Sequence, residues 1–163
     1  RLGALNALTL VPNIHQQQAL DWFYHRYQAE PLALDHWFAP QGRSPHNNPI
    51  ARIERLMKHK AFDWRKPNTV RALIGSFVHY NILHFHRPDG AGYSLFAKIL
   101  NHLDPINGKL AAQLAKVFHD ARFFDCSRQI QMIDLINSLL NQKDLSVDLR
   151  EVLDSGLSGV NKD

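Results

Sequence analysis

The chain has 163 residues, of which 45% are hydrophobic and 21% charged, a composition typical of one globular domain rather than of a disordered segment. The net charge of +4 is too small to indicate an anionic partner by itself. No run approaches the roughly 20 apolar residues that a membrane-spanning helix needs, so we expect no membrane association. The single cysteine excludes an internal disulfide and a cysteine-based zinc site, and it favours a reducing, cytoplasmic compartment.

The N-terminus has the pattern of a helix that is already under way. The chain begins with Arg1 rather than Met, and Leu2, Leu5 and Leu8 follow at helical spacing. We therefore expect residues 1–163 to form one helical domain that is a fragment of a larger protein.

Helical periodicity predominates in the first half of the chain, and strand-like alternation is hard to find. The pattern predicts a helix over residues 16–29, and Pro31 is predicted to start a short helix that ends at Pro40. Asn48 and Pro49 predict an N-cap and the first position of a third helix. Its buried stripe is predicted to be Ile50, Ile53, Leu56 and Met57, and its solvent face Arg52, Arg55 and Lys58.

The second half continues in the same way. Pro67 restarts the helical pattern, with a predicted apolar stripe of Val70, Leu73, Ile74 and Phe77. Residues 88–90 predict a turn in which glycine allows a positive φ, and residues 104–105 and Ser146 are expected to cap further helices. From Gly156 onward the chain is expected to fray. The short connections fit antiparallel neighbours in an irregular helical bundle or an α-solenoid, and periodicity does not separate the two.

Neither a metal site nor a nucleophile is predicted, although ten histidines invite the question. The metal-binding helix of zinc hydrolases needs His-Glu-x-x-His, and no His-Glu dipeptide occurs. His79, His84 and His86 match no common ligand spacing, so we expect surface or partly packed histidines. Cys126 has one acidic and one basic neighbour, and it is expected to be packed or half-exposed just before a helix.

The basic run from Arg52 to Arg71 is the strongest charge feature, with Phe62 and Trp64 between its cations. Basic residues interleaved with exposed aromatics are typical of a nucleic-acid surface. We favour the alternative of a solvated helix face whose aromatics fix a corner between helices, and we expect no nucleic-acid partner.

Several motifs are more specific than helical periodicity. Residues 66–77 read Lys-Pro-Asn-Thr-Val-Arg-Ala-Leu-Ile-Gly-Ser-Phe, and residues 85–93 contain Phe-His followed by Asp-Gly-Ala-Gly-Tyr. These stretches resemble the C-terminal domain of bacterial M1-family aminopeptidase N, the zinc-dependent alanyl aminopeptidase. Residues 34–38, 122–129 and 145–149 resemble further stretches of that domain in the same order. The resemblance covers nearly the whole chain.

The resemblance implies an all-α fold of paired antiparallel helices in an armadillo/HEAT-like superhelix, which favours the solenoid. It also implies a parent enzyme that binds one zinc ion through upstream motifs absent here and removes N-terminal residues from peptides. This segment would carry no catalytic or metal-binding residue. Its partners would be the upstream domains and, through the parent, the peptide substrate. The alternative is a stand-alone helical scaffold that binds a protein or a peptide.

The resemblance also implies candidate residues of the substrate cavity. A polar helix near the C-terminus of the family approaches that cavity, and residues 108–114 align with it. Lys109 and Gln113 are four residues apart and share a helix face, although they replace the Gln and Arg of the family. Arg71 matches the second Arg of the family motif and is the third candidate.

Overall fold

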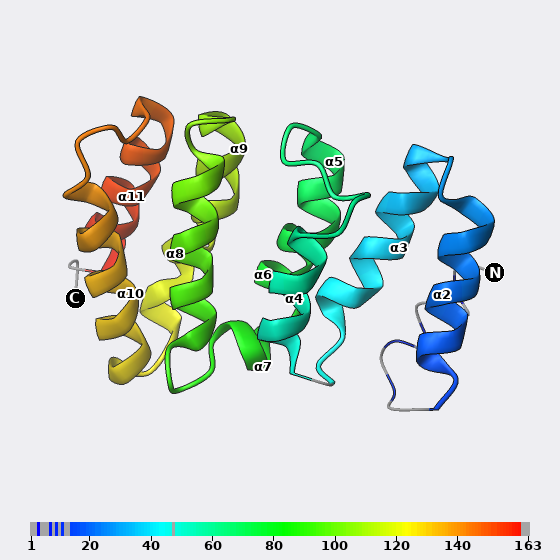
Figure 1. The fold of residues 1–163 in the computed structure, drawn as a ribbon. Helices are drawn as coiled ribbons and strands as arrows, with labels where there is room; N and C mark the ends of the chain where they lie inside the picture. The colour runs from blue at the N-terminus through cyan, green and yellow to red at the C-terminus, as the bar shows by residue number, and fades with distance from the viewer. Residues whose placement is uncertain are drawn as a thin grey trace. The chain divides into compact units, whose positions relative to one another are not determined.

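The computed structural model describes residues 3, 7, 9, 11, 14–46 and 48–160, the side chains of residues 159 and 160 excepted. Within these residues the chain is helical and contains no strand. It divides into two compact units, Arg1–His84 and Phe85–Asp163. Figure 1 shows the helices of each unit side by side. The predicted helical pattern at the N-terminus rests on Leu2, Leu5 and Leu8, and these three residues lie outside the described ones.

The first unit contains α2 (Gln16–Tyr27), α3 (Pro31–Arg43), α4 (Pro49–Met57), α5 (Pro67–Val70), η1 (Arg71–Gly75) and α6 (Ser76–Tyr80). Helix α3 is the centre of this unit, because α2, α4, α5, η1 and α6 all pack on it. The indole N–H of Trp37 on α3 donates to the carbonyl of Leu20 on α2 at 2.9 Å. The predicted stripe of Val70, Leu73, Ile74 and Phe77 is fully buried. The short α7 (Ile82–Phe85) contains the boundary between the units.

Helix α3 does not end at Pro40, as its sequence predicts, but continues to Arg43. Pro40 has no N–H to donate, which normally breaks a helix. Here Pro40, Gln41 and Gly42 are buried, and α3 packs against η1. A side chain at Gly42 would collide with the carbonyl of Leu73. Burial of this last turn therefore outweighs the lost hydrogen bond.

The predicted solvent face of α4 is wrong at Arg52, which is only 7% exposed. Its guanidinium donates to the carbonyls of Gln41, Ser44 and His46 at the end of α3 and in the following loop. Arg52 thus lies on the buried face together with Ile53, and its hydrogen bonds join α4 to the end of α3 and to the loop between the two helices.

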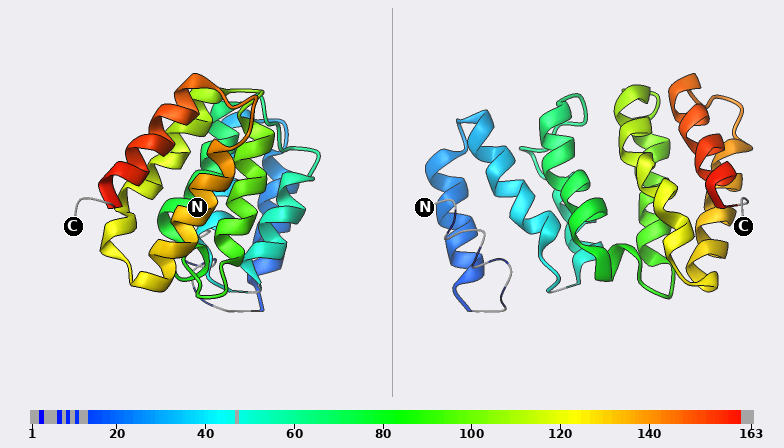
Figure 2. Two further views of the ribbon diagram at one scale, coloured as in Figure 1. Left: turned by 90° about the vertical axis from the view of Figure 1, so that its left-hand side faces the viewer. Right: turned by 180° about the vertical axis from the view of Figure 1, so that it is seen from behind.

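The second unit contains α8 (Ala91–Leu103), α9 (Gly108–Ala115), the 3₁₀ helix η2 (Lys116–Phe123), α10 (Cys126–Leu140) and α11 (Val147–Val160). Helix α11 packs on α9, η2 and α10, while α8 packs on α9 and α10. The views of Figure 2 show α10 and α11 beside one another. The predicted turn at residues 88–90 is confirmed, since Gly90 has a φ of +71° and precedes α8.

Two predicted boundaries of the second unit are wrong. Asp104 does not cap the helix that follows it, because Asn107 does so by accepting from the N–H of Leu110 at 3.0 Å. Asp104 instead accepts hydrogen bonds from the N–H and hydroxyl of Ser146, ahead of α11. Within the described residues the chain also does not fray from Gly156, since α11 runs to Val160 and Gly156 is buried, whereas residues 161–163 of the predicted tail lie outside the described residues.

None of the helices formed by the described residues is both long and apolar enough to span a membrane.

Candidate functional site

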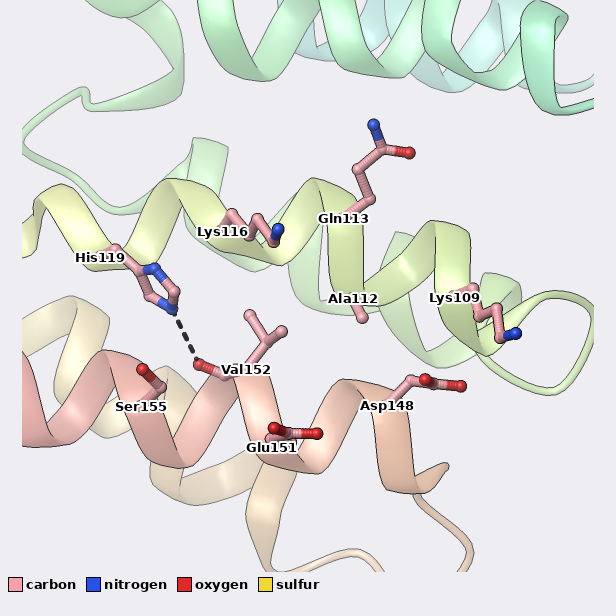
Figure 3. A pocket seen from close by; sticks show the side chains of 9 residues that line it. All are labelled: Lys109, Ala112, Gln113, Lys116, His119, Asp148, Glu151, Val152 and Ser155. Carbon is pink, nitrogen blue, oxygen red and sulfur yellow. Dashed lines mark hydrogen bonds between the residues drawn. The ribbon is translucent and has the colours of Figure 1, made fainter.

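A groove of about 550 Å³ runs between the α9–η2 segment and α11 in the second unit. Two of the predicted cavity residues, Lys109 and Gln113, lie on its α9 side, and Figure 3 shows them one turn apart. The residues that line the groove are Lys109, Ala112, Gln113, Lys116, His119, Asp148, Glu151, Val152 and Ser155.

Charges of opposite sign line the two sides of this groove. Lys109 and Lys116 come from the α9–η2 segment, whereas Asp148 and Glu151 come from α11 (Figure 3). No ion pair within 4.0 Å joins these four side chains. The groove therefore offers cations on one side and carboxylates on the other, an arrangement suited to binding polar or zwitterionic groups.

The groove shows no nucleophile–base pair, although His119 and Ser155 both line it. The Nε2 atom of His119 lies 3.2 Å from the carbonyl oxygen of Val152 (Figure 3), and no hydrogen bond joins His119 to Ser155. A serine needs hydrogen-bond contact with its base to be activated. In this geometry His119 therefore does not activate Ser155.

Local hydrogen bonds fix both walls of the groove. Asn107 caps α9, and Leu110 and Leu114 bury its inner face. The contact between Asp104 and Ser146 holds the start of α11, and the hydroxyl of Ser146 accepts from the N–H of Leu149 at 3.2 Å. Lys109 and Gln113 consequently project from a rigid helix rather than from a loop.

Arg71, the third predicted residue, lies in the first unit at the start of the π-helix η1. The N–H of Ser76 donates to the carbonyl of Arg71, five residues back, which is the π-type pattern. Arg71 is exposed and lines a second pocket, of about 720 Å³, within that unit. The structure thus brings Lys109 and Gln113 together, while a cavity shared with Arg71 stays a prediction.

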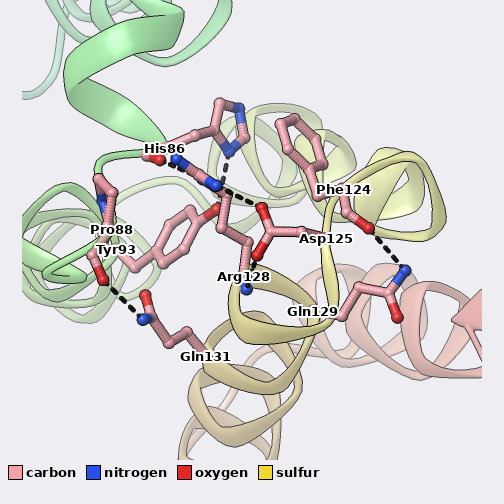
Figure 4. A network of polar contacts seen from close by, with 8 residues as sticks. All are labelled: His86, Pro88, Tyr93, Phe124, Asp125, Arg128, Gln129 and Gln131. Atoms are coloured by element: carbon pink, nitrogen blue, oxygen red, sulfur yellow. Dashed lines mark hydrogen bonds and ion pairs between the residues drawn. The ribbon is translucent and has the colours of Figure 1, made fainter.

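A polar cluster, comprising His86, Tyr93, Phe124, Asp125 and Arg128, lies elsewhere in the second unit (Figure 4). The His86 ring stacks on Phe124 with 4.1 Å between centroids, and its Nδ1 shares a 2.8 Å hydrogen bond with the hydroxyl of Tyr93. Arg128 donates through Nε to the His86 carbonyl at 2.6 Å and forms an ion pair with Asp125.

The imidazole ring of His86 is held in its neutral form. Burial, helped by the positive charge of Arg128 and opposed by Asp120, lowers the pKa of His86 to about 4. Burial also raises the pKa of Tyr93. At neutral pH both rings are therefore uncharged, as their packing requires.

The remaining sequence candidates are the histidines, Cys126 and the basic run. The described residues contain no group of three or more His, Cys, Asp or Glu side chains able to hold a metal ion. The prediction that Cys126 is packed or half-exposed just before a helix is wrong, because Cys126 is exposed and is the first residue of α10. In the basic run, Phe62 is buried and contacts Phe38 and Trp64 edge-on at 5.6 and 5.1 Å, so these aromatics do form a corner between helices.

Comparison with known families gives a match over nearly the entire chain. Residues 1–158 match the model described as a domain of unknown function (DUF3458_C) with ARM repeats. The chain belongs to this ARM-repeat family. The predicted all-α solenoid of the ARM type is therefore confirmed.

Curated relatives of this ARM-repeat chain are aminopeptidases. It is 36% identical over 115 residues to aminopeptidase N of Caulobacter vibrioides, covering 71% of the chain and 13% of the relative. It is 33% identical over 156 residues to aminopeptidase N of Haemophilus influenzae and 29% identical over 157 residues to that of Escherichia coli. In both cases the match covers 96% of the chain and 18% of the relative.

A solved structure has the same fold. Aminopeptidase A of Legionella pneumophila, crystallised in complex with aspartic acid, superposes with a TM-score of 0.88 at 35% identity. The match covers 95% of the ARM-repeat chain and 18% of that protein. The chain thus spans less than a fifth of the length of these relatives.

Sequence reasoning missed the two buried polar centres of the ARM-repeat chain, Arg52 and His86. Arg52 could have been found from spacing, since Pro49, Arg52 and Leu56 recur at three- and four-residue steps along the buried face of α4. No comparable pattern marks His86, whose ring partners Tyr93 and Phe124 are 7 and 38 residues away.

Proposed function

We propose that this chain is the non-catalytic C-terminal domain of a zinc-dependent M1 aminopeptidase that removes N-terminal residues from peptides. In this proposal the domain covers the active site of the parent and shapes its substrate cavity. The family match over residues 1–158, together with relatives that are aminopeptidases N over 96% of the chain, carries the proposal.

The zinc ion belongs, in this proposal, to another part of the parent enzyme. The chain contains no His-Glu dipeptide, and the described residues offer no metal-binding group. When bound there, zinc activates a water molecule and polarises the scissile carbonyl. A cytoplasmic location remains a prediction.

The contribution of this chain to the reaction would be binding and exclusion of water. Lys109 and Lys116 attract negatively charged groups of a peptide, and Asp148 and Glu151 attract positively charged ones. Gln113, four residues from Lys109 on the same helix, adds an amide that can donate and accept hydrogen bonds. A helical wall of this kind restricts entry to the site and keeps bulk water out.

Variants of the parent enzyme test the role of the groove. We expect Lys109→Ala combined with Gln113→Ala to lower kcat/KM for a tetrapeptide by about three- to tenfold, the effect of losing one or two exposed polar contacts. In this proposal the groove contacts only the further residues of a longer peptide, so the value for alanine p-nitroanilide should change by less than about twofold. Lys143→Ala, an exposed cation outside the groove, is the matched control. Equal losses for both substrates would contradict a role in peptide binding.

The purified 163-residue chain tests the division of labour. We expect it to be helical, to bind no stoichiometric zinc and to release nothing from alanine p-nitroanilide. Hydrolysis by this chain alone would overturn the assignment of catalysis to other parts of the parent. A reading frame around the chain that lacks His-Glu-x-x-His would instead favour the stand-alone scaffold.

A further inference from the structure

The pocket that Arg71 lines in the first unit lies between the start of α3 and the segment that leads into α5. It has a volume of about 720 Å³, within the range of pockets that hold small ligands. Its lining residues are Gln28, Ala29, Pro31, Leu32, Leu34, Asp35, Ala61, Arg65, Lys66, Pro67, Asn68, Thr69 and Arg71. All of them belong to the first unit, so the pocket is complete within it.

Positive charge predominates in this pocket. Three cations, Arg65, Lys66 and Arg71, face one carboxylate, Asp35. The Oδ1 of Asp35 accepts a hydrogen bond from the hydroxyl of Thr69 at 3.0 Å, and the three cations still exceed the one carboxylate by two. The side chains of Arg65, Lys66 and Arg71 belong to exposed residues, so an incoming anion can reach them.

The competing ion pair of Lys66 is weak. Its Nζ lies 3.9 Å from Asp63, and the two side chains are 62% and 43% exposed. An exposed pair at that distance contributes little. Lys66 can therefore exchange this contact for a ligand at small cost.

The opposite side of the pocket is apolar. Leu32 on the first turn of α3 is 72% exposed, and Pro31, Leu34 and Ala61 extend the apolar surface. Gln28 and Asn68 add amide groups that both donate and accept hydrogen bonds. Cations, an apolar wall and amides together match a ligand with an apolar body, a peptide backbone and one negative charge.

We propose that this pocket binds the carboxylate group of a short peptide, with Arg65 and Lys66 as its main cationic contacts and Leu32 against an apolar side chain. The proposal concerns this chain alone and goes beyond a role as a cover of the active site. Arg71 contributes further positive charge from the start of η1.

Titration of the 163-residue chain with three N-acetylated peptides, followed by NMR chemical shifts, tests the proposal. The probes are acetyl-Leu-Ala-Ala with a free carboxylate, the same peptide as its amide, and acetyl-Leu-Glu-Ala amide. We expect the free acid to bind with a Kd on the order of 1 mM and about fivefold more tightly than its amide, because one exposed ion pair is worth up to that factor. The third probe distinguishes a terminal carboxylate from a side-chain carboxylate.

Variants locate the site. Arg65→Gln and Lys66→Gln should each weaken binding of the free acid about two- to fivefold and leave the amide unchanged. Arg55→Gln, an exposed cation outside the pocket, is the matched control and should have no effect. Leu32→Ser should weaken the acid and the amide alike. Far-UV circular dichroism confirms that each variant keeps its helices.

Two results would overturn the proposal: equal binding of acid and amide, or no binding of either up to about 10 mM. Binding that Arg55→Gln weakens as much as Arg65→Gln would also overturn it, because diffuse attraction to the positive surface would then explain the difference. None of these results bears on catalysis by the parent enzyme, so failure here and failure of the proposed function are distinguishable.

Discussion

The two units bury a polar centre in different ways. In the first unit, the guanidinium of Arg52 is surrounded by the carbonyls of Gln41, Ser44 and His46. No carboxylate of the described residues forms an ion pair with it. In the second unit, the neutral ring of His86 packs on Phe124, and its carbonyl accepts from Arg128, which itself pairs with Asp125.

The difference shows how the charge of a buried centre determines its response to acid. Burial, with a smaller effect of Arg55, lowers the pKa of Arg52 to about 10, so Arg52 stays protonated throughout the acidic and neutral range. His86 has a pKa of about 4 in the fold, below the ordinary value of 6.5, and is neutral only above it. The polar centre of the first unit should therefore be insensitive to mild acid, whereas that of the second should not.

The largest effect is expected from Arg52→Met in the first unit. The substitution keeps much of the apolar stem but removes the donor to the carbonyls of Gln41, Ser44 and His46. The carbonyl of Ser44 keeps a hydrogen bond from the side-chain amide of Asn81 at 2.9 Å, whereas those of Gln41 and His46 lose their side-chain donor, and unpaired buried polar groups are costly. We expect a loss of about 3 kcal/mol in the free energy of unfolding. All three tryptophans, Trp22, Trp37 and Trp64, lie in this unit, so denaturant unfolding followed by tryptophan fluorescence reports it selectively.

The matched control for this variant is Arg55→Met on the exposed face of the same helix, with an expected change below about 0.5 kcal/mol. Equal losses for both substitutions would show that the carbonyl contacts of Arg52 do not stabilise the unit.

The second effect is the acid response of His86. Because folding lowers its pKa, the unfolded chain binds more protons between about pH 4 and 6.5, and stability falls as the pH decreases through that window. The expected loss in the free energy of unfolding of the second unit is on the order of 2 kcal/mol. This is less than the full pKa shift of His86 implies, because solvent around the ring stabilises part of its charge. Unfolding by urea at several pH values, followed by circular dichroism, measures it.

The variant His86→Phe keeps the stacking on Phe124, but its ring cannot be protonated. Its free energy of unfolding should therefore change less with pH across this window. The facing groups Tyr93, Arg128, Asp120 and Asp125 remain in this variant. An unchanged pH dependence would assign the acid response to other groups.

The helices themselves could be predicted from the sequence because local periodicity records which face is buried. The stripe from Val70 to Phe77, the turn at Gly90 and the cap at Ser146 are all local patterns, and all are confirmed. The prediction was wrong where distant residues decide the outcome. Helix α3 continues through Pro40 because its last turn is buried against η1, which lies more than 25 residues farther along the chain.

The candidate site divides in the same way. The spacing of Lys109 and Gln113 on one helix face is local and was predictable, and both residues line one groove. That α11 supplies Asp148 and Glu151 to the other wall depends on packing across more than 30 residues, which periodicity does not reveal. Arg65 and Lys66 fell within the predicted basic run, yet the apolar wall that makes a pocket beside them comes from α3.

A third effect is expected in the second unit from Asp104→Ala. Asp104 is 6% exposed, and its two carboxylate oxygens accept from the N–H and the hydroxyl of Ser146. The substitution leaves both donors of Ser146 unpaired and releases the start of α11, so we expect a loss of about 1–2 kcal/mol. Urea unfolding followed by circular dichroism measures the loss. The exposed Asp134→Ala on α10 serves as the control, and a comparable loss there would contradict the explanation.

The smallest effect comes from the two asparagine caps, one in each unit. Asn48 has a φ of +50°, and its side chain accepts from the N–H of Ala51 at a long 3.4 Å. Asn107 has a φ of −157° and accepts from the N–H of Leu110 at 3.0 Å. Glycine relieves a positive φ, so Asn48→Gly should change the stability by less than about 0.3 kcal/mol.

Asn107→Gly has no such compensation, because an extended backbone suits any residue. Because this variant loses the shorter hydrogen bond, its stability should fall by about 0.5 kcal/mol. Thermal unfolding of the two variants and of the unsubstituted chain measures the difference in stability. A larger loss for Asn48→Gly than for Asn107→Gly would contradict this explanation. The hydrogen bond of the Asn48 side chain would then stabilise the fold by more than its positive φ costs, and the shorter cap hydrogen bond would not be the stronger one.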